Sequence, residues 1–181
     1  MILAVLLLFC IANLFYKTDS QTRRFACFIA FGIYIFYSGY DYIWLCSNTD
    51  WPFHPSDPSA YYQEVVGKTL SGVLSLESSN TFYYIVNWIN WKVWQDPFFC
   101  SAILRLDNIL AYIAAYLLLT HKSRRFDYID LLLLFNPFTI VTMVRNVRDI
   151  YIILFVIIAL IGLGLMPRYK PNKIWTCVGI L

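Results

Sequence analysis

The sequence predicts an all-α fold, a polytopic membrane bundle of about five full transmembrane helices with interfacial or re-entrant helices in one long loop. Composition is the first reason: 60% of the residues are hydrophobic and 14% are charged, whereas a soluble domain carries ~25% charged residues. The second reason is the length of the apolar runs, several of which approach the roughly 20 residues that cross a bilayer. The third is an alternation of short basic loops with a long acidic one.

Five apolar runs are predicted to cross the membrane, namely residues 2–16, 25–46, 98–119, 128–144 and 150–166. The first and fourth are short but contain no Lys or Arg, so a lengthened end or local thinning of the bilayer would let them span. For residues 1–16 a cleaved secretory signal is the alternative, and the absence of a basic segment before the apolar run favours a retained helix.

A sixth apolar run begins at Ile174 and stops at Leu181. It has room for about two helical turns, too few to cross a bilayer. We therefore expect residues 1–181 to form a single transmembrane domain that is the N-terminal part of a longer protein.

The basic residues predict the orientation of the chain. Loops 17–24, 120–128 and 167–173 hold nine of the fourteen Lys and Arg residues, while loop 47–97 has five acidic and two basic residues. Because basic loops are retained in the cytoplasm, we place the N-terminus, loop 47–97 and the turn 145–149 outside. These clusters account for the net charge of +3, so no nucleic-acid partner is expected.

Loop 47–97 is predicted to contain short helices. Prolines exclude a helix over residues 47–58, and residues 60–76 can form one or two turns broken by glycines. Residues 81–94 are apolar but only 14 in number, with two Asn and one Lys, which indicates an interfacial or re-entrant helix. Its Tyr and Trp residues form either an aromatic belt or a surface that binds sugar or lipid.

Charged residues inside the predicted spans are expected to have partners, because a lone charge in hydrocarbon is costly. Asp41 and Arg105 fall at nearly the same depth in the second and third spans, so we predict an ion pair between them. The alternative is that Arg105 and Asp107 are structural polar groups of the interior. Metals and cofactors are not predicted, because the cysteines form no ligand motif and the two histidines lie on opposite sides.

The turn between the fourth and fifth spans contains Arg145 and Arg148, two cations on the outer side. A guanidinium presents a fork of donors that suits phosphate, so a lipid diphosphate is one expected ligand. The alternatives are lipid headgroups of the outer leaflet or a pair with Asp149.

Three segments carry a resemblance to a known family. The first is Asp57-Pro58-Ser59-Ala60-Tyr61-Tyr62 after the second span, the second is Leu76-Glu77 before the apolar stretch 82–89, and the third holds Arg145 and Arg148. Together they resemble the front half of the EpsG-like family of bacterial exopolysaccharide polymerases, which is related in layout to Wzy polymerases and GT-C glycosyltransferases. The resemblance covers residues 25–166. It departs from the family at Asp149, where an apolar or small residue is usual, and the family's later helices are absent.

The resemblance implies a glycan polymerase or lipid-linked-sugar glycosyltransferase of the bacterial inner membrane that acts on the outer face. Asp57 would be the catalytic carboxylate and Glu77 a second candidate. Arg145 and Arg148 would hold the diphosphate, and Tyr61 and Tyr62 would contact the substrate. The implied partners are membrane lipid, a polyprenyl-diphosphate-linked glycan and other envelope-polysaccharide proteins. For Asp57 the alternative is structural, because Ser-Asp-Pro is an ordinary turn.

A second class of function is a non-enzymatic membrane subunit or immunity-type protein that binds a partner through its aromatic outer loop. A transporter comes third, because no inverted repeat relates the two halves of the sequence.

Overall fold

The computed structural model describes residues 2–55, 57–76, 81–120, 125–145, 149–166 and 169–180, and within these ranges it is all helical. In chain order the helices are α1 (Ile2–Tyr16), α2 (Gln21–Thr49), α3 (Asp57–Val65), α4 (Leu70–Leu74), α5 (Thr81–Trp94), α6 (Pro97–Thr120), α7 (Tyr128–Phe135), α8 (Pro137–Arg145), α9 (Asp149–Gly162) and α10 (Lys173–Ile180).

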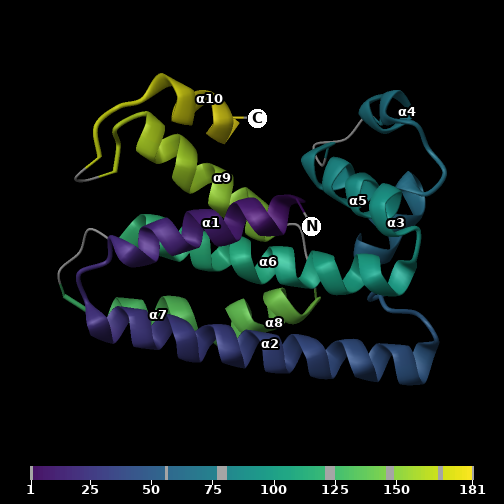
Figure 1. The fold of residues 1–181 in the computed structure, drawn as a ribbon, viewed down its shortest axis with the longest axis horizontal. Coiled ribbons are helices and arrows are strands. Elements are labelled where there is room, and N and C mark those ends of the chain that lie inside the picture. The colour runs from purple at the N-terminus through teal and green to yellow at the C-terminus, as the bar shows by residue number, and fades with distance from the viewer. Residues whose placement is uncertain are drawn as a thin grey trace.

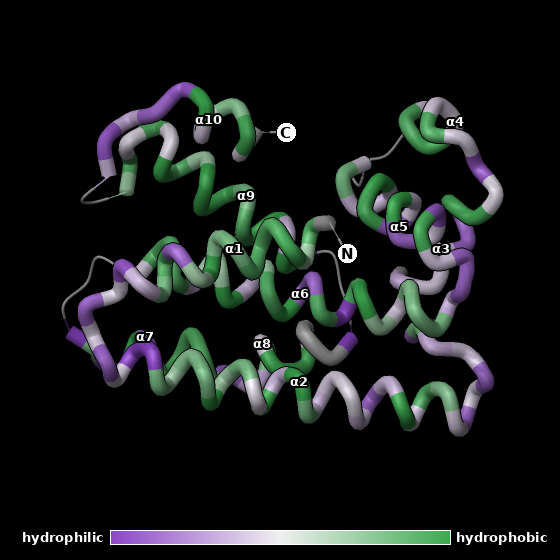
Figure 2. The backbone as a smooth tube through the Cα atoms, in the orientation of Figure 1, coloured by the Kyte–Doolittle hydropathy of each residue, from purple (hydrophilic) through white to green (hydrophobic). Residues whose placement is uncertain are grey.

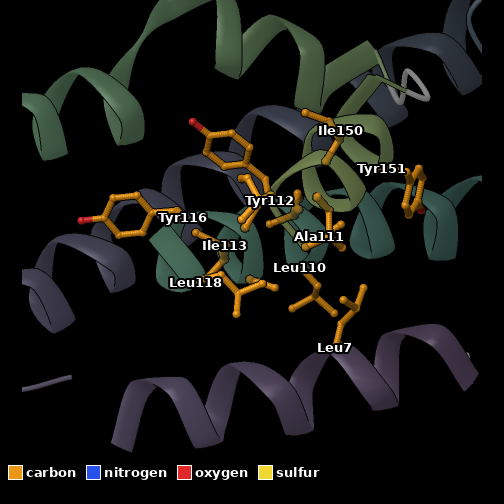
Figure 3. Close-up of a cluster of buried hydrophobic side chains, with 14 of the residues drawn as sticks. Leu7, Leu110, Ala111, Tyr112, Ile113, Tyr116, Leu118, Ile150 and Tyr151 are labelled. Atoms are coloured by element: carbon orange, nitrogen blue, oxygen red, sulfur yellow. The ribbon is translucent and has the colours of Figure 1, made fainter. Parts of the chain in front are cut away.

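The helices are organised around α6. α2 lies alongside it over most of the long axis of the molecule, and α7 and α8 follow each other along α2 (Figure 1). α1 and α9 pack against α6, α10 folds back on α9, and α5 packs on α6 at the opposite end. Figure 3 shows side chains of α6 meeting Leu7 of α1 and Ile150 of α9. The core is therefore built around one central helix.

Only α2 and α6, among the described helices, are long and apolar enough to cross a bilayer. α6 has 78% of its most apolar stretch buried, as the core helix of a soluble protein would. α2 has only 28% buried, and it leaves Phe25, Phe28 and Phe36 about two-thirds exposed. Figure 2 shows apolar residues along most of α6 and the first half of α2, whereas the second half of α2 mixes apolar and hydrophilic residues.

The prediction of five full spans is not confirmed. α1 has 15 residues and α9 has 14, which corresponds to about 21 to 23 Å of helix, short of the ~30 Å hydrocarbon core. The predicted fourth span, 128–144, is two helices, α7 and α8. The architecture is two long helices with shorter ones packed between and around them.

Pro137 explains the break between α7 and α8. A proline has no N–H and prevents the residue before it from being helical, and Asn136 is accordingly extended (φ −64°, ψ 128°). The carbonyls of Leu133 and Leu134 therefore lose their helical donors. The Tyr112 hydroxyl donates to the Leu133 carbonyl at 2.5 Å, and the Tyr34 hydroxyl donates to that of Leu134.

α9 and α10 form a tight antiparallel hairpin through small residues. A Cβ added to Gly162 would lie 2.2 Å from the backbone nitrogen of Thr176, and one added to Gly179 would lie 2.3 Å from that of Ala159. Real Cβ atoms do not approach a backbone so closely, so only glycine fits at both positions. Residues 174–180 of the short apolar run thus pack against α9, while Ile174 and Val178 stay exposed.

Loop 47–97 is more helical than the prolines indicated. α2 continues to Thr49 and ends at Asp50, whose backbone is left-handed (φ 52°). α3 begins at Asp57 with Pro58 in its first turn, where the missing N–H has no helical acceptor to lose. Gly67 (φ 77°) separates α3 from α4. α5 covers the predicted range 81–94.

The basic loops meet at one end of the molecule, which we call the basic end. The end of α1, both ends of the α6–α7 link and the α9–α10 connection lie there, opposite α3, α4 and α5 (Figure 1). Arg23 donates two hydrogen bonds to the two carboxylate oxygens of Asp130, both at 3.0 Å. The Tyr169 hydroxyl donates to the Leu118 carbonyl at 2.6 Å, and burial raises the pKa of this phenol to about 12.

Candidate functional site

The structure brings Asp41 and Arg105 together at the end of the molecule formed by α3, α4 and α5, which we call the loop end. Nη1 of Arg105 on α6 lies 2.8 Å from Oδ2 of Asp41 on α2. The Arg105 side chain is 4% exposed and that of Asp41 is 16% exposed. The guanidinium also donates to the Ser38 carbonyl at 3.4 Å and lies 5.8 Å from the centre of the Tyr42 ring. The pair therefore joins the two long helices.

His54 completes this cluster and was not predicted as part of it. Its Nε2 lies 3.0 and 3.1 Å from the two oxygens of Asp41. A carboxylate can only accept, so Nε2 donates, and a neutral ring then has its lone pair on Nδ1. The His54 side chain is 21% exposed, which leaves it within reach of a molecule outside the cluster, whereas Arg105 is shielded.

The segment 50–55 is fixed by contacts that hold His54 over α2. The Phe53 side chain is buried and stacks on Tyr62 with ring centres 4.7 Å apart. The Ser101 hydroxyl donates to the Pro52 carbonyl at 2.7 Å. The Trp51 indole N–H donates to the Ser59 hydroxyl at 2.9 Å. The return of the chain to Asp41 thus depends on α3 and α6.

Several aromatic residues of the loop end make contacts with other residues of the protein. The Trp88 indole N–H donates to the Lys68 carbonyl at 3.0 Å, and Trp94 stacks on Phe99 with ring centres 5.5 Å apart. The Lys92 ammonium lies 4.6 Å from the centre of the Trp91 ring. These contacts hold the loop end together, so fewer of its aromatic side chains are available to bind a partner.

Tyr61 and Tyr62, predicted to contact the substrate, are buried side chains of α3. Tyr61 packs edge-on against Tyr83 and Tyr84 of α5, with ring centres 5.3 and 5.1 Å away. Burial raises the pKa of the Tyr62 phenol. Both rings support the loop end from inside instead of lining an open surface, because the helix they occupy must pack on α5.

The remaining predicted site residues are placed only in part. Asp57 is the first residue of α3, three positions after His54, and its side chain lies outside the described part of the chain. Glu77 and Arg148 also lie outside the described residues. Arg145 ends α8 and its side chain is exposed. Among the described residues, no ion pair joins it to the Asp41 cluster.

A second charged cluster, at the basic end, is built differently. Asp130 accepts from Arg23, from the Tyr116 hydroxyl at 2.5 Å and from the Asp127 backbone N–H at 2.9 Å. Both charged side chains are almost fully buried. Such a closed network ties α2, α6 and α7 together and leaves no atom for a ligand, so it is structural. The sequence analysis did not predict this network, because it interpreted Arg23 only as a basic residue that sets the orientation in the membrane.

The chemistry available at the loop end is proton transfer. A histidine oriented by a carboxylate is a general base or acid of moderate strength, and Arg105 keeps the orienting carboxylate charged and in place. No protein-family model, curated protein or solved structure matches the chain. The function is therefore inferred from the chemistry of these residues and from the sequence resemblance.

Proposed function

We propose that this chain is a membrane-embedded glycosyltransferase of the exopolysaccharide-polymerase type that uses a polyprenyl-diphosphate-linked glycan. The observation that carries the proposal is the Asp41–His54–Arg105 cluster. The cluster lies toward one end of two long apolar helices, and His54 would act there as the base for the acceptor sugar of a lipid-linked substrate. α2 and α6 would span the bacterial inner membrane, with the basic end in the cytoplasm and the loop end outside.

Glycosyl transfer needs a base for the acceptor hydroxyl and a cation for the departing diphosphate. Two groups of one segment could be the base. Asp57 follows from the resemblance, and His54 follows from its contact with Asp41. The contacts favour His54, because its ring is oriented and partly exposed. Arg145, with an exposed guanidinium, would bind the diphosphate, together with Arg148.

The test is mass spectrometry of lipid-linked glycans and polymer in cells that carry the gene, lack it, or carry His54→Gln or Asp57→Asn. His121→Gln, the same change at the chain's other histidine, is the matched control. We expect deletion and His54→Gln to abolish polymer and accumulate the lipid-linked unit at normal protein levels, while His121→Gln has no effect.

Two other outcomes would change the proposal. Polymer lost with Asp57→Asn but normal with His54→Gln would assign the base to Asp57. Glycans that are unchanged by deletion of the gene would overturn the transferase proposal and favour the non-enzymatic membrane subunit.

A further inference from the structure

An apolar groove lies between α1 and α2, both of which pack on α6. Its volume is about 270 Å³, and all the residues that line it are apolar, if the thiol of Cys27 is counted as a small hydrophobe. Leu110 and Ile113 of α6 form a buried floor, whereas Ala12 of α1 and Phe28 of α2 are exposed wall residues. The groove is therefore open along its outer side.

The groove is narrow for its length. Its wall on α1 extends from Leu8 to Phe15, which corresponds to ~10 Å of helix. A volume of about 270 Å³ over this length gives a mean cross-section of roughly 26 Å², about a third of that of a helix ~10 Å across. A helix of a partner protein would therefore not fit within the groove, whereas a single extended hydrocarbon chain would.

One end of the groove lies at the basic end, beside Arg24. Phe15 and Phe28 meet edge-on there, with ring centres 5.3 Å apart, and Cζ of Arg24 lies 6.0 Å from the centre of the Phe15 ring. Nε of Arg24 donates to the Thr18 carbonyl at 2.9 Å, and Nη2 donates to the carbonyls of Thr18 and Tyr16. These bonds fix a guanidinium at the end of an apolar groove.

The charge of Arg24 is not neutralised by an ion pair. No carboxylate in the described part of the chain forms one with it, whereas Arg23 beside it is paired with Asp130. The link between α1 and α2 adds Lys17 and Asp19, both exposed. Two cations and one anion are thus available at this end of the groove, so an anionic group would be attracted there.

The two parts of this site select the class of ligand. Within a bilayer, a lipid chain gains little by leaving other lipid chains for apolar side chains, so the groove alone would not choose one lipid over another. A guanidinium binds phosphate well, and basic pockets between membrane helices bind the headgroups of anionic lipids. The combination therefore selects an amphiphile with one or more long chains and an anionic headgroup.

We propose that this groove binds one acyl chain of an anionic phospholipid, whose phosphate lies on Arg24. The chain would run from Phe15 toward Leu8, away from the water, over ~10 Å of the roughly 15 Å that one leaflet provides. The proposal rests on the membrane placement proposed above, in which the basic end faces the cytoplasmic leaflet. It does not depend on glycosyl transfer.

The experiment is native mass spectrometry of the purified chain in detergent, titrated with dioleoyl phosphatidylglycerol. Dioleoyl phosphatidylcholine has the same acyl chains with a zwitterionic headgroup, and glycerol 1-phosphate has the anionic group without the chains. We expect saturable binding of phosphatidylglycerol, roughly fivefold or more tighter than that of phosphatidylcholine, because a basic residue near the headgroup favours the anionic lipid. Glycerol 1-phosphate should not bind at the same concentrations.

The role of the charge is tested at Arg24. Arg24→Gln should abolish the preference for phosphatidylglycerol, and Arg24→Lys should keep most of it, because the charge remains. Lys170→Gln removes an exposed cation from the α9–α10 connection, also at the basic end, and should leave the preference intact. Equal affinity for the two lipids, or a preference that survives Arg24→Gln, would overturn the proposal.

The role of the groove is tested at Ala12, which lines it and is exposed. Ala12→Phe keeps the charge and fills the groove, so it should weaken the binding of both lipids at least tenfold. Ala60→Phe, the same change at an exposed alanine of α3, is the matched control. Unchanged lipid binding in Ala12→Phe would overturn the proposal.

A second copy of the chain is the other possible occupant of the groove. A dimer in detergent that Ala12→Phe dissociates would show that a copy covers the groove, and this result too would overturn the proposal. Lipid binding is measured on the purified chain and glycans are measured in cells, so the two proposals fail separately.

Discussion

Asp41 is the residue on which the loop end depends most, because it is held by groups from two other segments. Arg105 reaches it from α6, and His54 reaches it from the chain after α2. Arg105 is the more buried of the two and would be left with an uncompensated charge if the carboxylate were neutralised. Removal of one partner of a buried ion pair typically costs about 3 to 5 kcal/mol.

We expect Asp41→Asn to lower the free energy of unfolding by a few kcal/mol and His54→Gln to lower it less. The double variant Asp41→Asn/Arg105→Gln should cost less than the sum of its single changes, because both ends of the pair are then neutral. Thermal or denaturant unfolding in detergent measures this, with the exposed Glu64→Gln as control. Strict additivity would show that Asp41 and Arg105 do not interact in solution.

Sequence reasoning could pair Asp41 with Arg105 but not with His54. Both members of the first pair lie in apolar helices, where the rise per residue gives their depth. His54 lies among three prolines, a pattern that excludes a helix but says nothing of direction. The chain returns to α2 because Phe53 is buried beside Tyr62 and Ser101 holds the Pro52 carbonyl, and these tertiary contacts leave no local signal.

At the scale of elements, the break between α7 and α8 leaves two backbone carbonyls that accept hydrogen bonds from tyrosine hydroxyls. Tyr112 donates to the Leu133 carbonyl that Pro137 leaves without a donor. An unsatisfied buried carbonyl costs about 1 to 3 kcal/mol. We expect Tyr112→Phe to lower stability by this amount, while Tyr37→Phe, at an exposed tyrosine of α2, should have little effect.

The cause can be tested by restoring the missing donor. Pro137→Ala supplies an N–H at position 137 and relieves the restraint on Asn136. Tyr112→Phe should therefore be less costly in the Pro137→Ala background than in the original chain, as measured by a double-mutant cycle of unfolding free energies. An unchanged cost would mean that Tyr112 acts through packing alone.

The α9–α10 hairpin rests on two glycines that meet the backbone of the facing helix. Gly162→Ala and Gly179→Ala should each destabilise the protein by about 1 to 3 kcal/mol, because the added methyl forces the helices apart. Gly32→Ala in α2 is the control. Its Cβ would meet nothing within 4 Å, so it should be neutral or slightly stabilising. Equal effects at all three positions in an unfolding experiment would contradict the close approach.

The boundaries of elements were predictable where the apolar pattern was long or where an aromatic run stood alone, as for α5. The number of full spans was not, because an apolar run does not distinguish a straight helix from two helices around Pro137. The pattern also gave no sign that residues 174–180 pack on α9. That contact needs glycines on both helices, and single glycines have many other uses.

At the scale of the whole molecule, the helix ends beside the basic loops lie together and opposite α3, α4 and α5 (Figure 1). The sides of a membrane that the alternation of charge assigns to these two ends stay a prediction. Between the two ends, α2 exposes large apolar side chains such as Phe28, Phe36 and Ile43. A large exposed apolar face marks a surface that a membrane or another protein covers.

The orientation can be tested with single cysteines placed at the two ends. In a chain whose five cysteines are replaced by alanine, Asp50→Cys marks the loop end and Lys170→Cys marks the basic end, and both original side chains are exposed. We expect a membrane-impermeant maleimide to label Asp50→Cys in intact bacterial cells. Lys170→Cys should react only after the inner membrane is opened, because basic loops stay in the cytoplasm.

The reverse pattern would invert the topology and place His54 in the cytoplasm, away from any acceptor on the outer face. Labelling of neither position in intact cells, with both reactive in soluble extract, would show that the apolar face of α2 is covered by protein instead of lipid.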